Sequence, residues 1–345
     1  MFIKDFGDRI TYMTIGSKED KKLRVGVIVG GTPEELNDAI YTAHEVAKAL
    51  EGLGYHVEMI TFDERFEKAV KLARIDMAFI IDATYIGSKK VNYGLRDLLD
   101  KLKIPYTGSK SKAASITKNK SLSKKYFEKA GLLTPAYLEI SAQNLDTLEE
   151  RLVRYNVKSP YVIKPRDEGA GMDVYYINSL SELLKRAKKL LDRHKNLIVE
   201  SYIRGTEITI PILEIKGRVV PLACIEMEKA KSIKVLSYDV KSIMQFSPQK
   251  EIERVLRYHV PARIDKRLSE KIMKGAIVAH KTIECKGYSR IDTIVDRAKN
   301  VYFLEINSLP TLSEVGPFTK AARLRGFNYV DIINHVVHSV IDFMS

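Results

Sequence analysis

The first hundred residues alternate short apolar segments, rich in β-branched residues, with longer segments whose apolar positions recur at helical spacing. Strands are predicted at 23–29, 57–61 and 77–81, and a helix at 95–102. The helix predicted after the first strand carries an apolar stripe on Ile40, Ala43, Val46, Ala47, Leu50 and Leu53. Because strand and helix alternate, we expect an α/β domain with a doubly wound parallel sheet over roughly residues 20–112.

From residue 115 onward the pattern is typical of an α+β arrangement. Helices are predicted at 119–130, 145–155 and 180–194, and strands at 161–164, 174–177 and 197–200. The remaining part is predicted to hold several strands and a closing amphipathic helix at 330–343. The predicted fold class is therefore α/β followed by α+β.

Two strand-like segments near the end of the sequence carry the most informative polar positions. These segments span 288–295 and 301–310, and the polar turn between them predicts a hairpin. Glu305 and Asn307 are two residues apart and share a face, and an antiparallel partner can bring Asp292 beside them. Three hard oxygen donors, with room for phosphate and water oxygens, suit Mg²⁺. Arg290 shares that face as a fixed cation. The alternative is an exposed hairpin whose polar face only meets water.

Composition limits the function classes. Hydrophobic content of 45% and charged content of 29% over 345 residues indicate a folded globular protein. No apolar run approaches a membrane span and no signal peptide is recognisable, so we expect a cytoplasmic protein without a membrane partner. Cys224 and Cys285 are isolated thiols, which favours a reducing compartment and small core residues. The net charge of +13 favours anionic partners such as nucleotides, while no nucleic-acid motif is present.

The strand predicted at 161–164 leads into a small-residue loop. Small residues let backbone N–H groups approach phosphate oxygens, and Lys164 at the strand end can neutralise their charge. The loop residues are Glu168, Gly169, Ala170 and Gly171. The alternative is a simple turn, because the loop matches neither the P-loop signature nor the Rossmann fingerprint.

Acidic residues mark the next two strand boundaries. Glu200 lies at the end of one predicted strand, where a carboxylate can hold an adenine amino group with a ribose nearby. Glu207 opens the following β-branched strand, and Tyr202 and Ile203 lie between the two acids. The alternative for each acid is an exposed charge at the end of a strand.

The order of these features resembles the ATP-grasp superfamily, and most closely the D-alanine–D-alanine ligases. The resemblance covers nearly the whole chain from Arg24. The best match runs from Arg290 through Pro310, and the segments at 104–109 and 113–120 also resemble the family, except that Asn119 stands where Asp is usual. A segment at 238–241 resembles the Tyr-and-Lys part of the family's mobile lid.

The resemblance implies a set of roles. ATP would be held by Lys120, Lys164, Glu168, Gly169, Ala170, Gly171, Glu200, Tyr202, Ile203 and Glu207, and Mg²⁺ (or Mn²⁺) by Asp292, Glu305 and Asn307. The implied catalytic residues are Arg290, Glu35 and Lys241. A substrate carboxylate would become an acyl phosphate that an amine attacks, while Arg290 stabilises the oxyanion and Lys241 contacts the phosphates.

The same resemblance implies an organisation into domains. We expect an N-terminal extension at 1–20, a Rossmann-like domain preceding the ATP-grasp unit at 21–114, a central ATP-grasp subdomain at 115–205 and a C-terminal catalytic domain at 206–345. The implied partners are small-molecule amino-acid or peptide substrates, and the family suggests a homodimer.

Departures from the family concern the substrate. The segment 82–94 lacks the family's His and acidic residues, Ala170 and Gly171 replace a Ser pair, and Ser242 replaces an aromatic residue of the lid. Glu35 has two equal interpretations, substrate-amine recognition or a capping box with Thr32. The sequence therefore predicts an ATP-dependent carboxylate–amine ligase with an altered substrate pocket. The alternative is a regulatory or interaction protein that binds nucleotide on the same fold without ligase activity.

Overall fold

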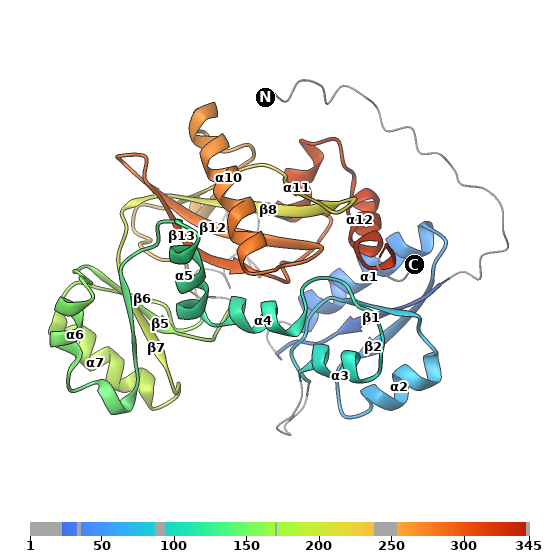
Figure 1. Cartoon of the computed structure of the whole chain (residues 1–345), viewed down its shortest axis with the longest axis horizontal. Helices are drawn as coiled ribbons and strands as arrows, with labels where there is room; N and C mark the ends of the chain where they lie inside the picture. The colour runs from blue at the N-terminus through green and yellow to red at the C-terminus, as the bar shows by residue number, and fades with distance from the viewer. Residues whose placement is uncertain (1–22, 33–35, 87–93, 170, 238–253, 343–345) are drawn as a thin grey trace.

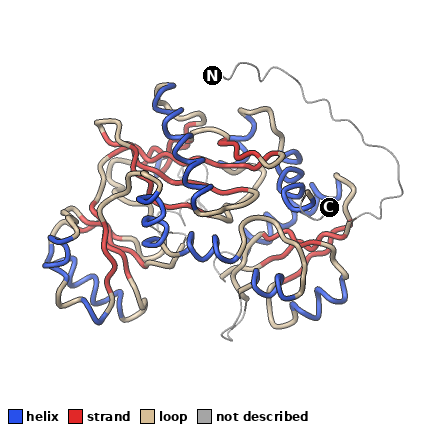
Figure 2. Tube along the Cα trace, in the orientation of Figure 1, coloured by secondary structure: helices blue, strands red, loops and turns tan. Residues whose placement is uncertain are grey.

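Three β-sheets organise the described part of the chain, as the grouping of strands in Figure 2 shows. The computed structural model describes residues 23–32, 36–86, 94–169, 171–237 and 254–342. The N-terminal, central and C-terminal parts of the sequence form three lobes, and the C-terminal lobe lies between the other two (Figure 1). The predicted N-terminal extension and the predictions for Glu35, Ala170, Lys241 and Ser242 concern residues outside these described ranges.

The first sheet is parallel, with strand order β2-β1-β3. Its strands are β1 (Arg24–Val29), β2 (His56–Thr61) and β3 (Met77–Ile80), and its helices are α1 (Leu36–Gly52), α2 (Phe66–Ala73) and α3 (Leu95–Lys101). Alternate side chains of β1 pack toward opposite faces, since Val27 clusters with α1 while Ile28 clusters with α2 and α3. The predicted doubly wound α/β arrangement is thereby confirmed. The predicted stripe was wrong at Ile40, which is 39% exposed, because α1 turns that side to solvent.

The second sheet is antiparallel, with strand order β4-β7-β5-β6. Two helices, α4 (Ser111–Lys118) and α5 (Lys120–Lys129), precede it. Its elements are β4 (Tyr137–Ile140), the 3₁₀ turn η1 (Ala142–Asn144), α6 (Leu148–Arg154), β5 (Tyr161–Pro165), β6 (Tyr175–Ile177), α7 (Leu180–Leu191) and β7 (Leu197–Ser201). The apolar faces of α6 and α7 pack on one face of the sheet around Leu148, Leu183 and Ile163.

The third sheet is antiparallel and has the order β11-β10-β8-β12-β13, with β9 paired to β8. Its strands are β8 (Gly205–Ile215), β9 (Arg218–Pro221), β10 (Ile225–Lys229), β11 (Leu256–His259), β12 (Tyr288–Asp296) and β13 (Val301–Asn307). Helix α10 (Lys266–Thr282) packs on one face, and α11 (Pro317–Arg323) and α12 (Tyr329–Ile341) follow the hairpin. The sheets and helices together make the α/β plus α+β class that the sequence predicted.

Hydrophobic contacts join the first and third sheets. Helix α12 packs on both α1 and β8, and its buried Ile332 and Val336 share one cluster with Val27 of β1 and Leu213 of β8. The two parts of the chain that are farthest apart in sequence therefore share a core beside the C-terminus (Figure 1).

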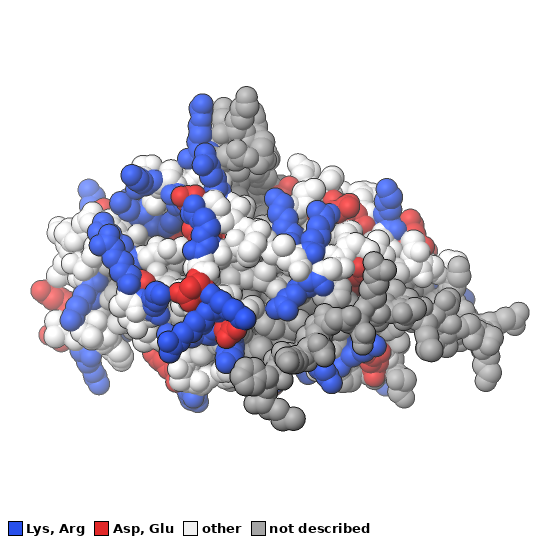
Figure 3. All heavy atoms as spheres, turned by 90° about the horizontal axis from the view of Figure 1, so that it is seen from above, with Lys and Arg blue, Asp and Glu red and all other residues white. Residues whose placement is uncertain are grey.

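The two thiols are buried, as the sequence predicted, and charged side chains cover the surface. Lys and Arg side chains are spread over the face seen in Figure 3, with Asp and Glu among them. Cys224 and Cys285 are both buried and unpaired, and burial raises the pKa of the Cys285 thiol to about 12, so it remains neutral. None of the helices in the described ranges combines the length and apolar character that crossing a membrane requires.

Helix α10 approaches β13 closely at a glycine. A Cβ atom built on Gly275 would lie 2.4 Å from Cζ of Phe303, a buried ring on β13. Phe303 is two residues from Glu305, so this contact supports the strand that carries a candidate metal ligand. Gly52, at the end of α1, has no described atom within 4 Å of its built Cβ.

We predict that Gly275→Ala destabilises the protein, although alanine favours a helix by about 0.5–1 kcal/mol. Overpacking against Phe303 costs about 1–3 kcal/mol, which exceeds that gain. Gly52→Ala is the matched control and should be neutral or stabilising. Urea unfolding of both variants measures the difference, and a Gly275→Ala protein as stable as the Gly52→Ala protein would contradict the packing argument.

Candidate functional site

The candidate metal ligands lie side by side on the paired strands β12 and β13. Asp292 is directly opposite Glu305, and Arg290 is directly opposite Asn307. The predicted antiparallel hairpin is confirmed, and the four side chains are brought to neighbouring positions. All four are partly exposed, in contrast to the buried residues Ile291 and Ile306 between them.

Hydrogen bonds orient the Asp292 carboxylate. Arg290 donates through Nε to Oδ1 at 3.0 Å and through Nη2 to Oδ2 at 2.8 Å. Thr209 of β8 donates its hydroxyl to Oδ1 at 2.6 Å. The charge of Asp292 also raises the pKa of the Arg290 guanidinium above its ordinary value. Arg290 is therefore held as a cation and aligned by the neighbouring acid.

The fit of these oxygen donors to Mg²⁺ depends on how many acceptor positions their other hydrogen bonds leave open. A carboxylate has about four acceptor positions, and Asp292 uses three of them, which leaves one on Oδ2. The amide oxygen of Asn307 accepts one bond, from the backbone N–H of Leu309 at 2.9 Å. Within the described ranges no group of three or more His, Cys, Asp or Glu residues is placed so that these residues alone could hold a metal ion. Two carboxylates and one amide oxygen still fit a hard cation that takes its remaining ligands from phosphate and water.

A buried cluster of charges lies in the second sheet. Glu200 on β7 is 3% exposed, and its Oε2 accepts a hydrogen bond from Lys164 Nζ at 3.1 Å. Its Oε1 lies 3.2 Å from Lys124 Nζ of α5, in ion-pair contact without hydrogen-bond geometry. Burial alone would raise the pKa of Glu200, but the two lysines outweigh it and hold the pKa below its ordinary value.

One alternative given for this cluster is wrong, and one of its residues was not predicted. The alternative in which Glu200 is an exposed charge is wrong, because the carboxylate is enclosed between two lysines. Lys124 was missed, since a lysine-rich helix is usually solvated. The available signal was its position one helical turn after Lys120, which places both lysines on one face of α5.

Lys120 connects α5 with the small-residue loop. Its backbone N–H donates to the carbonyl of Arg166 at 3.1 Å, and its ammonium group donates to the carbonyl of Glu168. Burial lowers the pKa of Lys120, and Glu305 opposes that effect. Arg166 holds the start of the loop through ion pairs with Glu139 and Asp167. The structure therefore brings Lys120 to the loop that the sequence singled out, on the side facing the hairpin.

The link from β7 to β8 carries the remaining candidates. Tyr202 packs edge-on against Tyr176 of β6, with ring centroids 4.9 Å apart. Ile203 is partly exposed, and Glu207 at the start of β8 forms an ion pair with Lys229 of β10. This link joins the second sheet to the third, so its residues lie where the two sheets meet (Figure 1).

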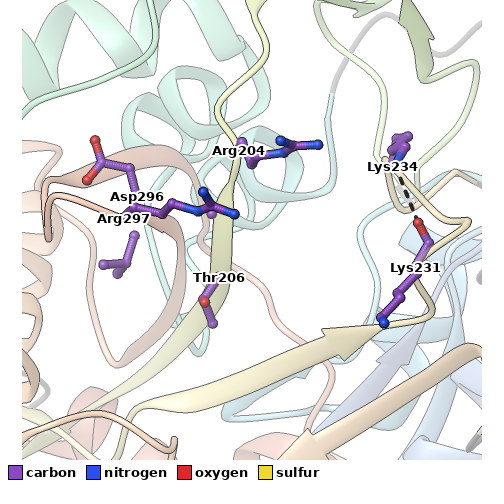
Figure 4. Close-up of a pocket in the computed structure, with 8 residues that line it drawn as sticks. Arg204, Thr206, Lys231, Lys234, Asp296 and Arg297 are labelled. Atoms are coloured by element: carbon purple, nitrogen blue, oxygen red, sulfur yellow. Dashed lines mark hydrogen bonds between the residues drawn. The ribbon is translucent and has the colours of Figure 1, made fainter.

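A cavity of about 570 Å³ opens next to this link (Figure 4). Arg204, Lys231 and Arg297 line it with Asp296, and Lys234 donates to the carbonyl of Lys231 at 3.4 Å. The cavity lies at the end of β12 that follows Asp292, beyond Glu207, so it is separate from the candidate metal ligands. Its lining is mostly positive, with one acid, Asp296.

The segments that follow β1 and β3 pack against each other. Gly31 donates its backbone N–H to the carbonyl of Thr84 at 3.1 Å, and a Cβ on Gly30 would lie 2.2 Å from the same oxygen. The loop after β3 therefore packs directly on the two glycines. Neighbouring carboxyl ends of parallel strands are where α/β sheets bind ligands.

The chain is similar to known proteins along most of its length. The model of the family described as D-ala D-ala ligase C-terminus matches residues 126–338. A D-alanine–D-alanine ligase from Carboxydothermus hydrogenoformans is 30% identical over 91% of this chain and 97% of its own length. The same enzyme from Aquifex aeolicus is 29% identical over 91% of this chain and its full length.

Solved structures show the same fold. The D-alanine–D-alanine ligase of Bacillus anthracis in complex with ATP superposes with a TM-score of 0.74, at 24% identity over 93% of this chain and 98% of that one. The VanG D-Ala:D-Ser ligase from Enterococcus faecalis gives a TM-score of 0.75, at 17% identity over 93% of this chain and 100% of that one.

The fold is thus that of ATP-grasp enzymes. This chain belongs to the D-alanine–D-alanine ligase family, whose members form carbon–nitrogen bonds.

We predict that Glu200→Gln destabilises the protein by about 3–5 kcal/mol at pH 7, because it leaves two buried lysines without their anion. Since the pKa of Glu200 is lowered on folding, its contribution is complete above the ordinary glutamate pKa of about 4.3 and is lost as the pH falls through the lowered value. Urea unfolding at pH 7, 5 and 3 should show the deficit shrinking only toward pH 3.

Glu284→Gln is the matched control for this substitution. Glu284 pairs with Lys112 at 3.1 Å, but both side chains are more than 60% exposed. Removing that pair should change stability by less than about 1 kcal/mol. Equal stabilities of the two variants at pH 7 would show that the Glu200 cluster does not stabilise the fold.

Proposed function

We propose that this protein activates a substrate carboxylate as an acyl phosphate and joins it to an amine, as a ligase similar to the D-alanine–D-alanine ligases with an altered substrate pocket. The observation that carries the proposal is the direct opposition of Asp292 and Glu305 beside Arg290 and Asn307. A structural hairpin has no need for this combination of charges. The proposal keeps the domain limits given above, at 21–114, 115–205 and 206–345, and includes a homodimer as a further expectation.

The proposed nucleotide contacts run from the second sheet to the third. Lys120 and Lys164 would contact phosphates together with the loop residues Glu168, Gly169, Ala170 and Gly171, and Lys241 would join them from outside the described residues. Glu200 and Glu207 would contact adenine and ribose, with Tyr202 and Ile203 packing beside the base. The lowered pKa of Lys120, caused by burial, indicates a cation that an incoming phosphate would stabilise.

Mg²⁺ bound to Asp292, Glu305 and Asn307 would offset the negative charge that develops between the phosphates during transfer. The chain's own residues hold and orient the groups. In the proposed sequence, a carboxylate oxygen attacks the γ-phosphorus of ATP and ADP leaves. The amine nitrogen then attacks the acyl carbon, an amide bond forms, and inorganic phosphate and one proton are released.

Arg290 would stabilise the oxyanion that forms in the second step. Its two bonds to Asp292 fix the guanidinium plane before any substrate arrives, so little reorganisation is needed. The charge of Asp292 raises the pKa of Arg290, so the guanidinium is charged at neutral pH.

The substrate is proposed as an amino acid or short peptide. The family suggests D-alanine, while the loop after β3 lacks the family's His and acidic residues and packs through Thr84 on Gly30 and Gly31. Glu35 lies outside the described residues and keeps both interpretations, amine recognition or helix capping. A changed loop at the ligand-binding ends of β1 and β3 supports a pocket of different shape.

We predict that the protein releases ADP when ATP and Mg²⁺ are supplied with D-alanine or with another member of an amino-acid and dipeptide panel. Glu305→Gln should lower kcat by about 100-fold or more, because a metal ligand that offsets transition-state charge is lost. The measurement is coupled ADP release, with mass spectrometry of the joined product.

Asp296→Asn is the matched control, since Asp296 ends the same strand as Asp292 and is bonded to Asn300 outside the site. It should keep wild-type activity. Failure with D-alanine alone removes only that substrate. Absence of ADP over the whole panel, with ATP still bound, would favour the regulatory nucleotide-binding protein instead.

A further inference from the structure

Lys124 is a fully buried cation, and neither the sequence analysis nor the proposed mechanism assigns it a role. Its side chain is 0% exposed on α5. The ammonium group donates to the hydroxyl of Thr134 at 3.0 Å and lies 3.2 Å from Oε1 of Glu200. Burial lowers its pKa, opposed chiefly by Glu200. A buried lysine is costly unless it has a defined partner, so the position of Lys124 calls for a reason.

Thr134 extends this contact to the third sheet. Its hydroxyl donates to the carbonyl of Phe303 on β13 at 2.8 Å, and Phe303 donates its own backbone N–H to the carbonyl of Leu133 at 2.8 Å. Phe303 lies two residues before the candidate metal ligand Glu305. Lys124 therefore stands between the strand that carries Glu200 and the strand that carries Glu305.

The two lysines at Glu200 differ in their freedom. Lys164 is 10% exposed and is influenced by Glu305 and Glu207 as well as by Glu200, so it can also serve a phosphate. Lys124 is enclosed and fixed by Thr134. A bound nucleotide would compete with Glu200 for Lys164, and Lys124 would remain as the constant counter-ion.

We propose that Lys124 is a positioning residue that keeps Glu200 ionised and aligned as the acceptor for the adenine amino group. The proposal rests on the assignment of Glu200 to the base in the proposed function. An ionised carboxylate accepts a hydrogen bond and cannot donate one. It therefore favours the amino group of adenine and disfavours the carbonyl oxygen that guanine presents at the equivalent position. Lys124 thus contributes to the choice of ATP over GTP without touching the nucleotide.

The test is the selectivity of Lys124→Met for ATP over GTP. Calorimetric titration with non-hydrolysable analogues of the two nucleotides, in the presence of Mg²⁺, measures it without requiring turnover. ATP affinity should fall about tenfold, as expected when a charged hydrogen bond is misaligned. GTP affinity should fall less or rise, so the ratio of ATP affinity to GTP affinity decreases. In turnover, KM for ATP should rise while kcat changes little.

Lys125→Met is the matched control, since Lys125 is the exposed neighbour on the same helix. It should leave both affinities and the ratio unchanged. Thr134→Val is a milder second variant that keeps the lysine and removes the Thr134 hydroxyl, with its contacts to Lys124 and to the carbonyl of Phe303. It should lower the ratio of ATP affinity to GTP affinity in the same direction. It keeps the inference testable if Lys124→Met does not fold, as judged by its thermal melting.

The outcomes separate this inference from the function on which it rests. If wild type shows no preference for ATP, or Glu200→Gln leaves the preference intact, the assignment of Glu200 to the base is wrong. If Glu200→Gln loses the preference while folded Lys124→Met and Thr134→Val keep it, the role of Lys124 is overturned. A parallel loss of ATP and GTP affinity in both variants would also overturn it, because a merely structural role predicts that result.

Discussion

The position of β12 between β8 and β13 is the constraint on which the site depends. β12 pairs with β8 over its whole length and with β13 from Arg290 to Val295. Its core-facing side chain Ile291 packs under α10, while Arg290 and Asp292 take the opposite face. A slip of one residue would reverse these faces, so burial of the apolar face fixes the polar one. The packing that stabilises the sheet therefore also aligns the candidate ligands.

A bulge in β13 allows its apolar side chains to pack in the core while its candidate metal ligands share one face. Asp292 pairs with Glu305, but the next residue of β12 pairs with Phe303, so Leu304 has no direct partner. Because of this extra residue, Phe303 and Ile306 both face the core although they are three positions apart. Strict alternation would have turned one of them outward. Glu305 and Asn307 lie on the same side of the bulge and keep their common face, which is why a simple period-two interpretation placed them correctly.

The sequence pattern predicted those features that depend on residues within a single segment. The parallel first sheet, the hairpin and the face shared by Arg290 and Asp292 follow from periodicity within single segments. The bulge was not predicted from the strand's own pattern, and the residue at which it begins, Phe303, packs against Gly275 of a helix that is distant in the sequence. Lys124 was not predicted for a similar reason, because its partners Thr134 and Glu200 lie outside its own helix. A charged side chain on a helix looks the same in sequence whether it meets water or a buried acid.

The residues proposed for phosphoryl transfer and the loop proposed to shape the substrate pocket lie on different sheets. This separation affects how the substrate specificity of such a protein can change. The charges proposed for phosphoryl transfer lie on the second and third sheets, where Glu200 and Asp292 each depend on several fixed partners. Replacing one of them leaves other buried or aligned charges unpaired, which makes change there costly. The loop after β3 contacts the first lobe through the backbone at Gly30 and Gly31 and through the ring of Tyr85, which packs on Phe62, and these contacts involve no charged side chain. Side chains in that loop can be replaced without disturbing the charge network, so a new substrate is reached most easily there.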